Sequence, residues 1–180
     1  SHFQSGLRNL LDDAVLAHVE LHAELGADSG YSKVDELPFD FSRRRLSVVV
    51  ADAQGRHTLI CKGAVEEIFA ACTHYRMGGE TGLLDASRFQ TAKAEMEALN
   101  ADGFRVVAVA YKTIASPKTD YTLADEADLT LLGYIAFLDP PKESAREAIA
   151  ALAAKGVCVK ILTGDNEIIT RKVCTEVNLD

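Results

Sequence analysis

The chain has 180 residues, of which 48% are hydrophobic and 26% are charged, and its formal net charge is −8. This length and composition are sufficient for one well-cored domain and part of a second. The negative charge argues against nucleic acid as a partner, because binding to a phosphate backbone requires a basic surface. It leaves room for a local cationic pocket that binds a small anionic ligand.

The pattern of apolar residues and cysteines excludes several other classes. No apolar run approaches the roughly 20 residues that span a bilayer, and the N-terminus has no signal-peptide pattern, so we expect a soluble segment of cytoplasmic character. His18 and His22 have the spacing of a metal-binding pair, but no further ligand accompanies them, and no metal site is expected. The cysteines form no C-x-x-C pair and are expected to be reduced and mostly buried; they are Cys61, Cys72, Cys158 and Cys174.

Periodicity predicts an α+β domain in the first part of the chain. Apolar residues at helical spacing form an N-terminal helix that ends by Gly26, and Asp12 and Asp13 lie on the flanks of its apolar stripe. Turn signals join the following strand patterns as hairpins, which gives an antiparallel sheet flanked by helices. The predicted elements are strands at 34–41, 46–53 and 57–62, helices at 64–71 and 86–100, and a strand at 104–114.

The pattern changes after a polar, acidic connector at 115–128. The elements predicted after it are a strand at 129–138, a helix at 142–155, a strand at 157–162 and a helix at 167–177. Alternating strands and helices with doubly buried strands are typical of a parallel α/β sheet. We therefore expect a first domain at 1–128 and a partial α/β segment at 129–180.

Two strand-like runs of the first domain carry residues that a buried strand rarely has. Phe39, which follows a proline, can stack on a purine, and base–aromatic stacking is worth roughly 1–3 kcal/mol. Arg44 and Lys62 offer positive charge to phosphates, and Gly63 lets a ligand approach the main chain where a helix begins. These residues fit one nucleotide pocket. The alternative is that the arginines at 43–45 protect an edge strand from aggregation and that the lysine-glycine pair is a turn.

Five short motifs, in this order, resemble the P-type cation-transporting ATPases. They are Phe39 followed five positions on by a basic residue, Lys62-Gly63-Ala64, Gly103-Phe104-Arg105-Val106-Val107, Leu138-Asp139-Pro140-Pro141-Lys142 and Thr163-Gly164-Asp165-Asn166. Each motif alone is weak, but the five in the family's order are a strong signal. The resemblance covers essentially the whole chain, and the amino-acid sequences of segments 39–45 and 133–143 are most similar to those of the bacterial magnesium-transporting members.

The resemblance implies roles for two further residues. In the family an acidic residue on the first helix hydrogen-bonds the adenine amino group, and Asp12 is the matching position. Asp13 is a possible substitute, and a solvated helix carboxylate is the alternative for both. The arginine that matches Arg105 contacts the nucleotide phosphates in the family, and a charge at a sheet edge is the alternative. The expected nucleotide-binding residues are Asp12, Phe39, Arg44, Lys62, Gly63 and Arg105.

The stacking ring has two possible assignments. Phe39 with Arg44 preserves the family's spacing between ring and basic residue, and we prefer it. Phe41 with Arg45 or Arg43 behind it is the alternative, and strand alternation places both rings on the same face, so periodicity does not choose between them. Many family members have lysine in place of Arg44, and a guanidinium differs from an ammonium in pairing bidentately with phosphate or stacking on a ring.

The second segment resembles part of the family's phosphorylation domain, which is of the haloacid-dehalogenase type. The Asp-Lys-Thr-Gly-Thr motif with the aspartyl nucleophile is absent from the sequence, and so is the Gly-Asp-Gly-x-Asn-Asp segment that helps to hold magnesium. The chain is therefore expected to bind ATP but not to hydrolyse it. By resemblance, Thr163, Gly164 and Asp165 would face the phosphoryl site of the intact enzyme, and Asp139 would lie at the hinge between the domains.

The resulting hypothesis is the ATP-binding domain of a magnesium-transporting P-type ATPase, a cytoplasmic domain of a bacterial inner-membrane protein. The expected ligand is ATP with Mg²⁺, and the expected partners are the remaining phosphorylation, actuator and membrane domains of the same polypeptide. A cap-containing dehalogenase-like phosphatase is disfavoured because its Asp-x-Asp nucleophile is missing. A non-catalytic interaction module is disfavoured because Phe39, Lys62, Gly63 and Arg105 occur together. No Gly-x-x-x-x-Gly-Lys pattern exists, which excludes a P-loop ATPase.

Overall fold

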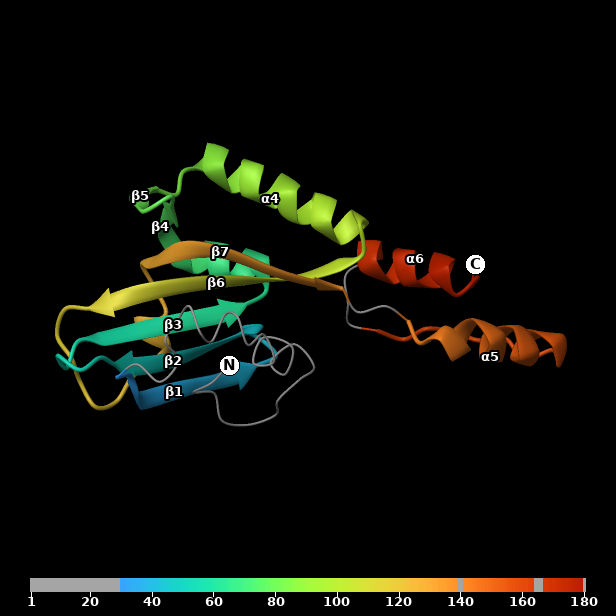
Figure 1. The fold of residues 1–180 in the computed structure, drawn as a ribbon, viewed down its shortest axis with the longest axis horizontal. Coiled ribbons are helices and arrows are strands. Elements are labelled where there is room, and N and C mark those ends of the chain that lie inside the picture. The colour runs from blue at the N-terminus through green and yellow to red at the C-terminus, as the bar shows by residue number, and fades with distance from the viewer. Residues whose placement is uncertain (1–29, 139–140, 164–166, 180) are drawn as a thin grey trace. The chain divides into compact units, whose positions relative to one another are not determined.

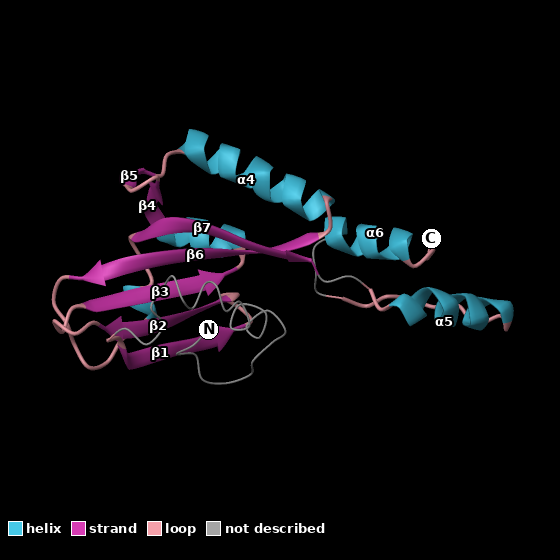
Figure 2. Ribbon diagram, viewed as in Figure 1, coloured by secondary structure: helices cyan, strands magenta, loops and turns pink. Residues whose placement is uncertain are grey.

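The computed structural model describes residues 30–138, 141–163 and 167–179 (Figures 1 and 2). The predicted N-terminal helix, with Asp12 and Asp13, lies outside these residues. The described chain forms two compact units. One contains residues 30–89 and 107–135, and the other contains residues 90–106 and 136–179.

A seven-stranded sheet with the order β1-β2-β3-β6-β7-β4-β5 forms the first unit, and β6 and β7 continue into the second. Its strands are β1 (Ser32–Asp40), β2 (Arg45–Ala51), β3 (His57–Gly63), β4 (Cys72–Met77), β5 (Glu80–Leu83), β6 (Phe104–Ile114) and β7 (Leu129–Leu138). The pairs β1–β2, β2–β3, β3–β6 and β4–β5 are antiparallel, in line with the antiparallel sheet expected here, whereas β4 pairs with β7 in parallel. Strands β4 and β5 were not among the predicted strands. The predicted α+β class is confirmed.

Both faces of the sheet are buried at β2, where Leu46, Val48 and Val50 form a cluster on one face. On the other face, alternate residues of neighbouring strands are inaccessible to solvent. Val49, Leu59, Cys61, Ala108 and Ala110 have no exposed surface. The predicted helix at 64–71 forms as α3 (Val65–Ala71) and buries Ile68 and Phe69. The Phe69 ring packs edge-on against Phe89 and Tyr134, with centroids 5.1 and 6.1 Å away. The contact with Tyr134 attaches α3 to β7 of the sheet, and the contact with Phe89 attaches it to the first turn of α4 (Ala86–Ala101).

The connector between β6 and β7 passes behind the sheet (Figure 1) and is fixed by polar contacts. The backbone N–H of Tyr121 donates to Asp35 Oδ2 at 2.7 Å, and the Tyr121 hydroxyl lies 2.7 Å from His57 Nδ1. A short 3₁₀ turn, η1 (Leu123–Asp125), is closed by a capping box between Thr122 and Asp125. The acidic connector is therefore an ordered part of the sheet's surface.

The strand predicted at 129–138 forms as β7, but its neighbours differ from the expected ones. The sequence pattern grouped it with a strand at 157–162 in a parallel α/β sheet. In the structure β7 is hydrogen-bonded between β6 and β4, so both of its edges are occupied within the first sheet. The division of the chain at residue 128 into two domains stays a prediction.

The second unit contains most of α4 (Ala86–Ala101), together with α5 (Glu143–Ala154) and α6 (Glu167–Glu176), close to the predicted helices. The Arg146 guanidinium donates to the backbone carbonyl of Glu176 and joins α5 to the end of α6. The predicted strand at 157–162 is wrong: this segment has no regular structure, and Leu162 is 95% exposed. A parallel strand requires a hydrogen-bonded neighbour, and no described strand pairs with this segment. Its dehalogenase-like character stays a prediction.

Candidate functional site

A bulge near the end of β1 brings Phe39 to the sheet face that carries Lys62. The pairing of β1 with β2 shifts from Leu37–Ser47 to Asp40–Arg45, so two residues of β1, at positions 38 and 39, span the single β2 residue Leu46. Leu46 in turn lies opposite Lys62 of β3. Asp40 lies opposite Arg45 and side chains alternate along a strand, so Phe39 belongs to the face of Leu46 and Lys62, and the three form a row across three strands. Two strand spacings place the Cα atoms of Phe39 and Lys62 about 10 Å apart.

Both candidate stacking rings have exposed surface. Phe39 is 49% exposed and Phe41 is 89% exposed, and their rings meet edge to face with centroids 5.2 Å apart. Strand β1 ends at Asp40, so Phe41 lies in a turn and not on the strand. Strand alternation therefore does not govern where the Phe41 ring points. Either ring has a free edge or face for a planar ligand.

The turn formed by residues 41–44, called here the Phe41–Arg44 turn, is held by Asp40. The Asp40 carboxylate accepts hydrogen bonds from the backbone N–H groups of Ser42 and Arg43, both at 2.9 Å. These hydrogen bonds hold the pKa of Asp40 below its usual range, and the bond from the Arg43 N–H has the largest effect. The Asp40 carbonyl accepts from the N–H of Arg44 at 2.7 Å, and Arg44 closes the turn with a φ of 46°. The local sequence thus fixes a tight reversal directly after Phe39.

Gly63 allows β3 to approach this turn closely. A Cβ atom at residue 63 would lie 2.5 Å from the Arg44 carbonyl oxygen and 2.5 Å from the Arg45 Cβ, both far inside normal contact. The N–H of Ala64 donates to the same Arg44 carbonyl at 2.9 Å. The missing side chain therefore makes room for the protein's own backbone, beside the position where the sequence pattern predicts a ligand.

Positive charge at the site comes from side chains. The Arg44 guanidinium is 53% exposed and pairs with Glu67 of α3 at 2.8 Å, and this hydrogen bond raises the pKa of Arg44. Lys62 is partly buried on β3. The first turn of α3 contains Glu66 and Glu67, whose carboxylates already neutralise the positive end of the helix dipole. The positive charge here is therefore carried by Lys62 and Arg44 and not by the start of the helix.

The other two arginines of the triplet bind a buried carboxylate that the sequence analysis missed. Glu126 Oε2 accepts from Arg43 Nη1 at 2.6 Å and from Arg45 Nε at 2.9 Å. The partners are 83 and 81 residues apart in sequence. No local pattern distinguishes Glu126 from its acidic neighbours in the connector, which are Asp120, Asp125 and Asp128.

Comparison with known proteins decides the family. The family model described as "P-type ATPase, cytoplasmic domain N" matches residues 15–144, which is more than half of the chain. The chain belongs to this P-type ATPase family. The resemblance seen in the five motifs is thereby confirmed.

Full-length relatives show the same relationship. The chain is 51% identical over 180 residues to "Magnesium-transporting ATPase, P-type 1" of Salmonella typhimurium and of Escherichia coli K12, covering 100% of this chain and 20% of each relative. It is 31% identical over 147 residues to "Calcium-transporting ATPase 1" of Lactococcus lactis, covering 82% of this chain and 17% of the relative. The chain thus spans about a fifth of the length of these curated P-type ATPases.

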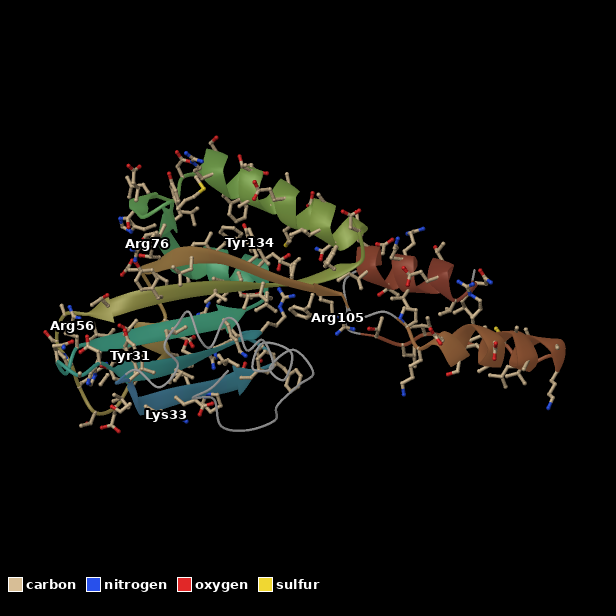
Figure 3. All side chains as sticks on the ribbon, viewed as in Figure 1. Tyr31, Lys33, Arg56, Arg76, Arg105 and Tyr134 are labelled. Carbon is tan, nitrogen blue, oxygen red and sulfur yellow. The ribbon has the colours of Figure 1, made fainter. Side chains whose placement is uncertain are left out.

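The structure of this P-type ATPase N domain brings four of the predicted site residues together around one turn: Phe39, Arg44, Lys62 and Gly63. Arg105, labelled in Figure 3, is partly buried near the start of β6 and belongs to the second unit. Thr163 is exposed at the end of the irregular segment after α5. The remaining predicted site residues lie outside the described part of the chain, and they are Asp12, Asp139, Gly164 and Asp165.

The cysteines and acidic groups of the described N domain form no other recognisable centre. All four cysteines are free thiols, and burial raises the pKa of Cys61 to about 11 and that of Cys72 to about 12. Within the described ranges, no three His, Cys, Asp or Glu side chains are arranged to hold a metal ion. Of the helices that the structure describes, none combines the length and apolar character needed to cross a bilayer.

Proposed function

We propose that this chain is the nucleotide-binding domain of a magnesium-transporting P-type ATPase and that ATP binds on the sheet face of Phe39 and Lys62. The observation that carries the proposal is the row Phe39, Leu46 and Lys62, because it places an exposed aromatic ring and a cation on either side of a buried leucine across three strands. An extended ATP molecule spans such a row from its base to its phosphates.

The side chains of the row supply the interactions that ATP requires. The Phe39 ring stacks on adenine, with Phe41 as the neighbouring edge-on ring. Lys62 and Arg44 attract the phosphates. Mg²⁺ accompanies ATP through the phosphate oxygens, which are its preferred ligands. Asp12 would add a hydrogen bond to the adenine amino group.

In the intact protein, the bound ATP would be presented to an aspartyl nucleophile that lies outside this chain. Residues 129–180 would belong to the phosphorylation domain, where Thr163, Gly164 and Asp165 would face the phosphoryl group and Asp139 would lie at the hinge. The identity of 51% to relatives named as magnesium transporters supports Mg²⁺ as the transported ion. The partners would be the phosphorylation, actuator and membrane domains of the same polypeptide, and the location would be the cytoplasmic side of a bacterial inner membrane.

Calorimetric titration with ATP and GTP tests this function. The chain should bind ATP with a Kd of roughly 0.1–1 mM, about −5 kcal/mol, and should prefer ATP to GTP. Because stacking is worth roughly 1–3 kcal/mol, Phe39→Ala should weaken ATP binding by about five-fold or more. Lys62→Ala should weaken it as well. Tyr31→Ala is the matched control, because Tyr31 is an exposed aromatic residue beside β1 with 54% of its surface accessible (Figure 3).

Three results would change the proposal. If Phe41→Ala abolishes binding and Phe39→Ala does not, the ring assignment passes to Phe41 and the site stands. If Tyr31→Ala weakens binding as much as Phe39→Ala, the effect is not specific to the row. If the wild-type chain does not bind ATP at several millimolar, a non-catalytic interaction module replaces the proposed function.

A further inference from the structure

The carboxylate of Glu126 is the centre of a buried polar cluster, called here the Glu126 cluster, which consists of Glu126, Arg43, Arg45 and Ser47. Its side chain has no exposed surface, and those of Arg43 and Arg45 are only 20% and 17% exposed. Oε2 accepts from the two guanidinium groups, and Oε1 accepts from the Ser47 hydroxyl at 2.7 Å. Both carboxylate oxygens are therefore satisfied away from water.

The two arginines extend the cluster to the segments that surround the nucleotide site. Arg43 Nη2 donates to the backbone carbonyl of Pro38 at 3.0 Å, in the bulge that carries Phe39. Arg45 Nη1 donates to the backbone carbonyl of Glu67 in α3 at 3.0 Å, and the side-chain carboxylate of the same Glu67 binds Arg44. One carboxylate thus ties the end of β1, the Phe41–Arg44 turn, the start of β2 and α3 to the connector.

This arrangement is better suited to fixing geometry than to adding stability. Removing charges from water is costly, and the attraction within a buried ion pair mostly offsets that cost without exceeding it. Apolar side chains of similar volume would pack this position at least as well. What an apolar substitute lacks is the directional set of hydrogen bonds that fixes Arg43 and Arg45, and with them the bulge before Phe39 and the turn after it.

We propose that Glu126 is a positioning residue for the nucleotide site: it holds the bulge and the Phe41–Arg44 turn in the conformation that binds ATP. Glu126 is buried beneath the arginines that it binds, so it acts on the nucleotide only through Arg43 and Arg45. The inference rests on the proposed function, because it concerns the affinity of that same site.

The direction of the change in ATP affinity on Glu126→Gln distinguishes a positioning role of Glu126 from a purely electrostatic one. The Glu126 cluster contains two guanidinium groups and one carboxylate, so Glu126→Gln raises its net charge from +1 to +2. A more positive cluster beside the site would strengthen the binding of an anionic nucleotide. Loss of the fixed turn would weaken ATP binding, because the apparent Kd is inversely proportional to the population of the binding-competent conformation.

Asp35→Asn is the matched control. Asp35 is also a partly buried carboxylate that fastens the same connector to β1, through the backbone N–H of Tyr121 at 2.7 Å. Its substitution changes the net charge of the chain by the same amount and breaks the same kind of connector contact. No hydrogen bond that the structure shows for Asp35 reaches residues 38–45; the two partners described are Tyr121 and Glu36.

The experiment measures ATP affinity by calorimetry on the 180-residue chain, for wild type, Glu126→Gln and Asp35→Asn. Each protein is studied at a temperature where its own melting curve shows it to be folded. Backbone amide NMR signals of residues 42–44 report on the turn directly. We expect Glu126→Gln to shift these signals and to raise the Kd about five-fold, as when the competent conformation falls to about a fifth of the molecules. Asp35→Asn should leave both the Kd and the signals of the turn unchanged.

Each other outcome overturns the inference. If wild type binds ATP and Glu126→Gln binds it equally well, the cluster is merely structural. If Glu126→Gln binds ATP more tightly, its effect is electrostatic. If Asp35→Asn weakens binding as much as Glu126→Gln, the connector acts on the site without a special role for Glu126. If wild type itself does not bind ATP, the proposed function fails and the inference falls with it.

Discussion

Replacing Gly63 with alanine tests whether the close contact between β3 and the Phe41–Arg44 turn shapes the nucleotide site. The new Cβ would lie 2.5 Å from the Arg44 carbonyl oxygen and 2.7 Å from the Arg45 Cα. Both are backbone atoms, so no side-chain rotation relieves the overlap. The turn and the start of β2 must move away from β3, and the hydrogen bond from the Ala64 N–H to Arg44 must lengthen.

The expected loss of stability follows from two opposing effects. Overpacking of this kind costs about 1–3 kcal/mol. Alanine also restricts the unfolded chain, which returns about 0.4–1 kcal/mol. The midpoints of these two ranges give a net destabilisation of about 1.3 kcal/mol, and with an m value near 2 kcal/mol/M this lowers the urea midpoint by roughly 0.7 M.

Urea denaturation followed by circular dichroism measures the stability, and calorimetry of the folded protein measures ATP affinity. Gly55→Ala is the control: Gly55 lies in the turn before β3, has a φ of 73° and has no neighbour within 4 Å of a new Cβ. Strain at this positive φ costs about 1–2 kcal/mol, but it acts at the far end of the strand from the site. Gly55→Ala should lose stability and keep its ATP affinity, whereas Gly63→Ala should lose both. Wild-type stability and affinity in Gly63→Ala would refute the argument.

Two further predictions concern titratable groups. Burial raises the pKa of Cys61 to about 11 and that of Cys72 to about 12. Iodoacetamide at pH 8 should therefore modify the exposed Cys158 first and reach Cys61 and Cys72 only in urea, as measured by mass spectrometry. Equal rates of modification at Cys61 and Cys158 would contradict this prediction. The pKa of Asp40 is lower in the folded chain than in the unfolded one, so its stabilising effect is present above about pH 4 and is lost as the pH falls through the folded-state pKa. The difference in melting temperature between wild type and Asp40→Asn should therefore shrink towards pH 2, and a difference that does not change with pH would show that the Asp40 charge is unimportant.

Much of the local structure could be predicted because it depends on neighbouring residues. Hairpin turns, the helix after Gly63 and the long strand β6 each follow from short patterns of apolar residues and glycines. The pairing of β7 could not be predicted in this way, because an apolar strand pattern indicates burial on both faces but does not show which strands lie along its two edges. The segment 157–162 has the same kind of pattern without such neighbours, and it forms no strand.

The candidate site shows the same division between local and distant causes. Phe39, Lys62 and Gly63 were recognisable because each is unusual within its own strand. Periodicity left the choice between Phe39 and Phe41 open, because it cannot show that β1 contains a bulge and ends before Phe41. Likewise, the three adjacent arginines were equivalent in sequence. The structure separates them because Arg43 and Arg45 meet a carboxylate more than 80 residues away, while Arg44 faces α3.

The most direct test of the central claim is an amide NMR titration of the isotopically labelled chain with ATP. The account predicts saturable shifts that cluster at Phe39, at the Phe41–Arg44 turn and at Lys62 and Gly63, with a Kd in the range of roughly 0.1–1 mM. Shifts that do not saturate, or that appear only in α5 and α6 while this cluster remains unchanged, would contradict the assignment of the nucleotide site to this face of the sheet.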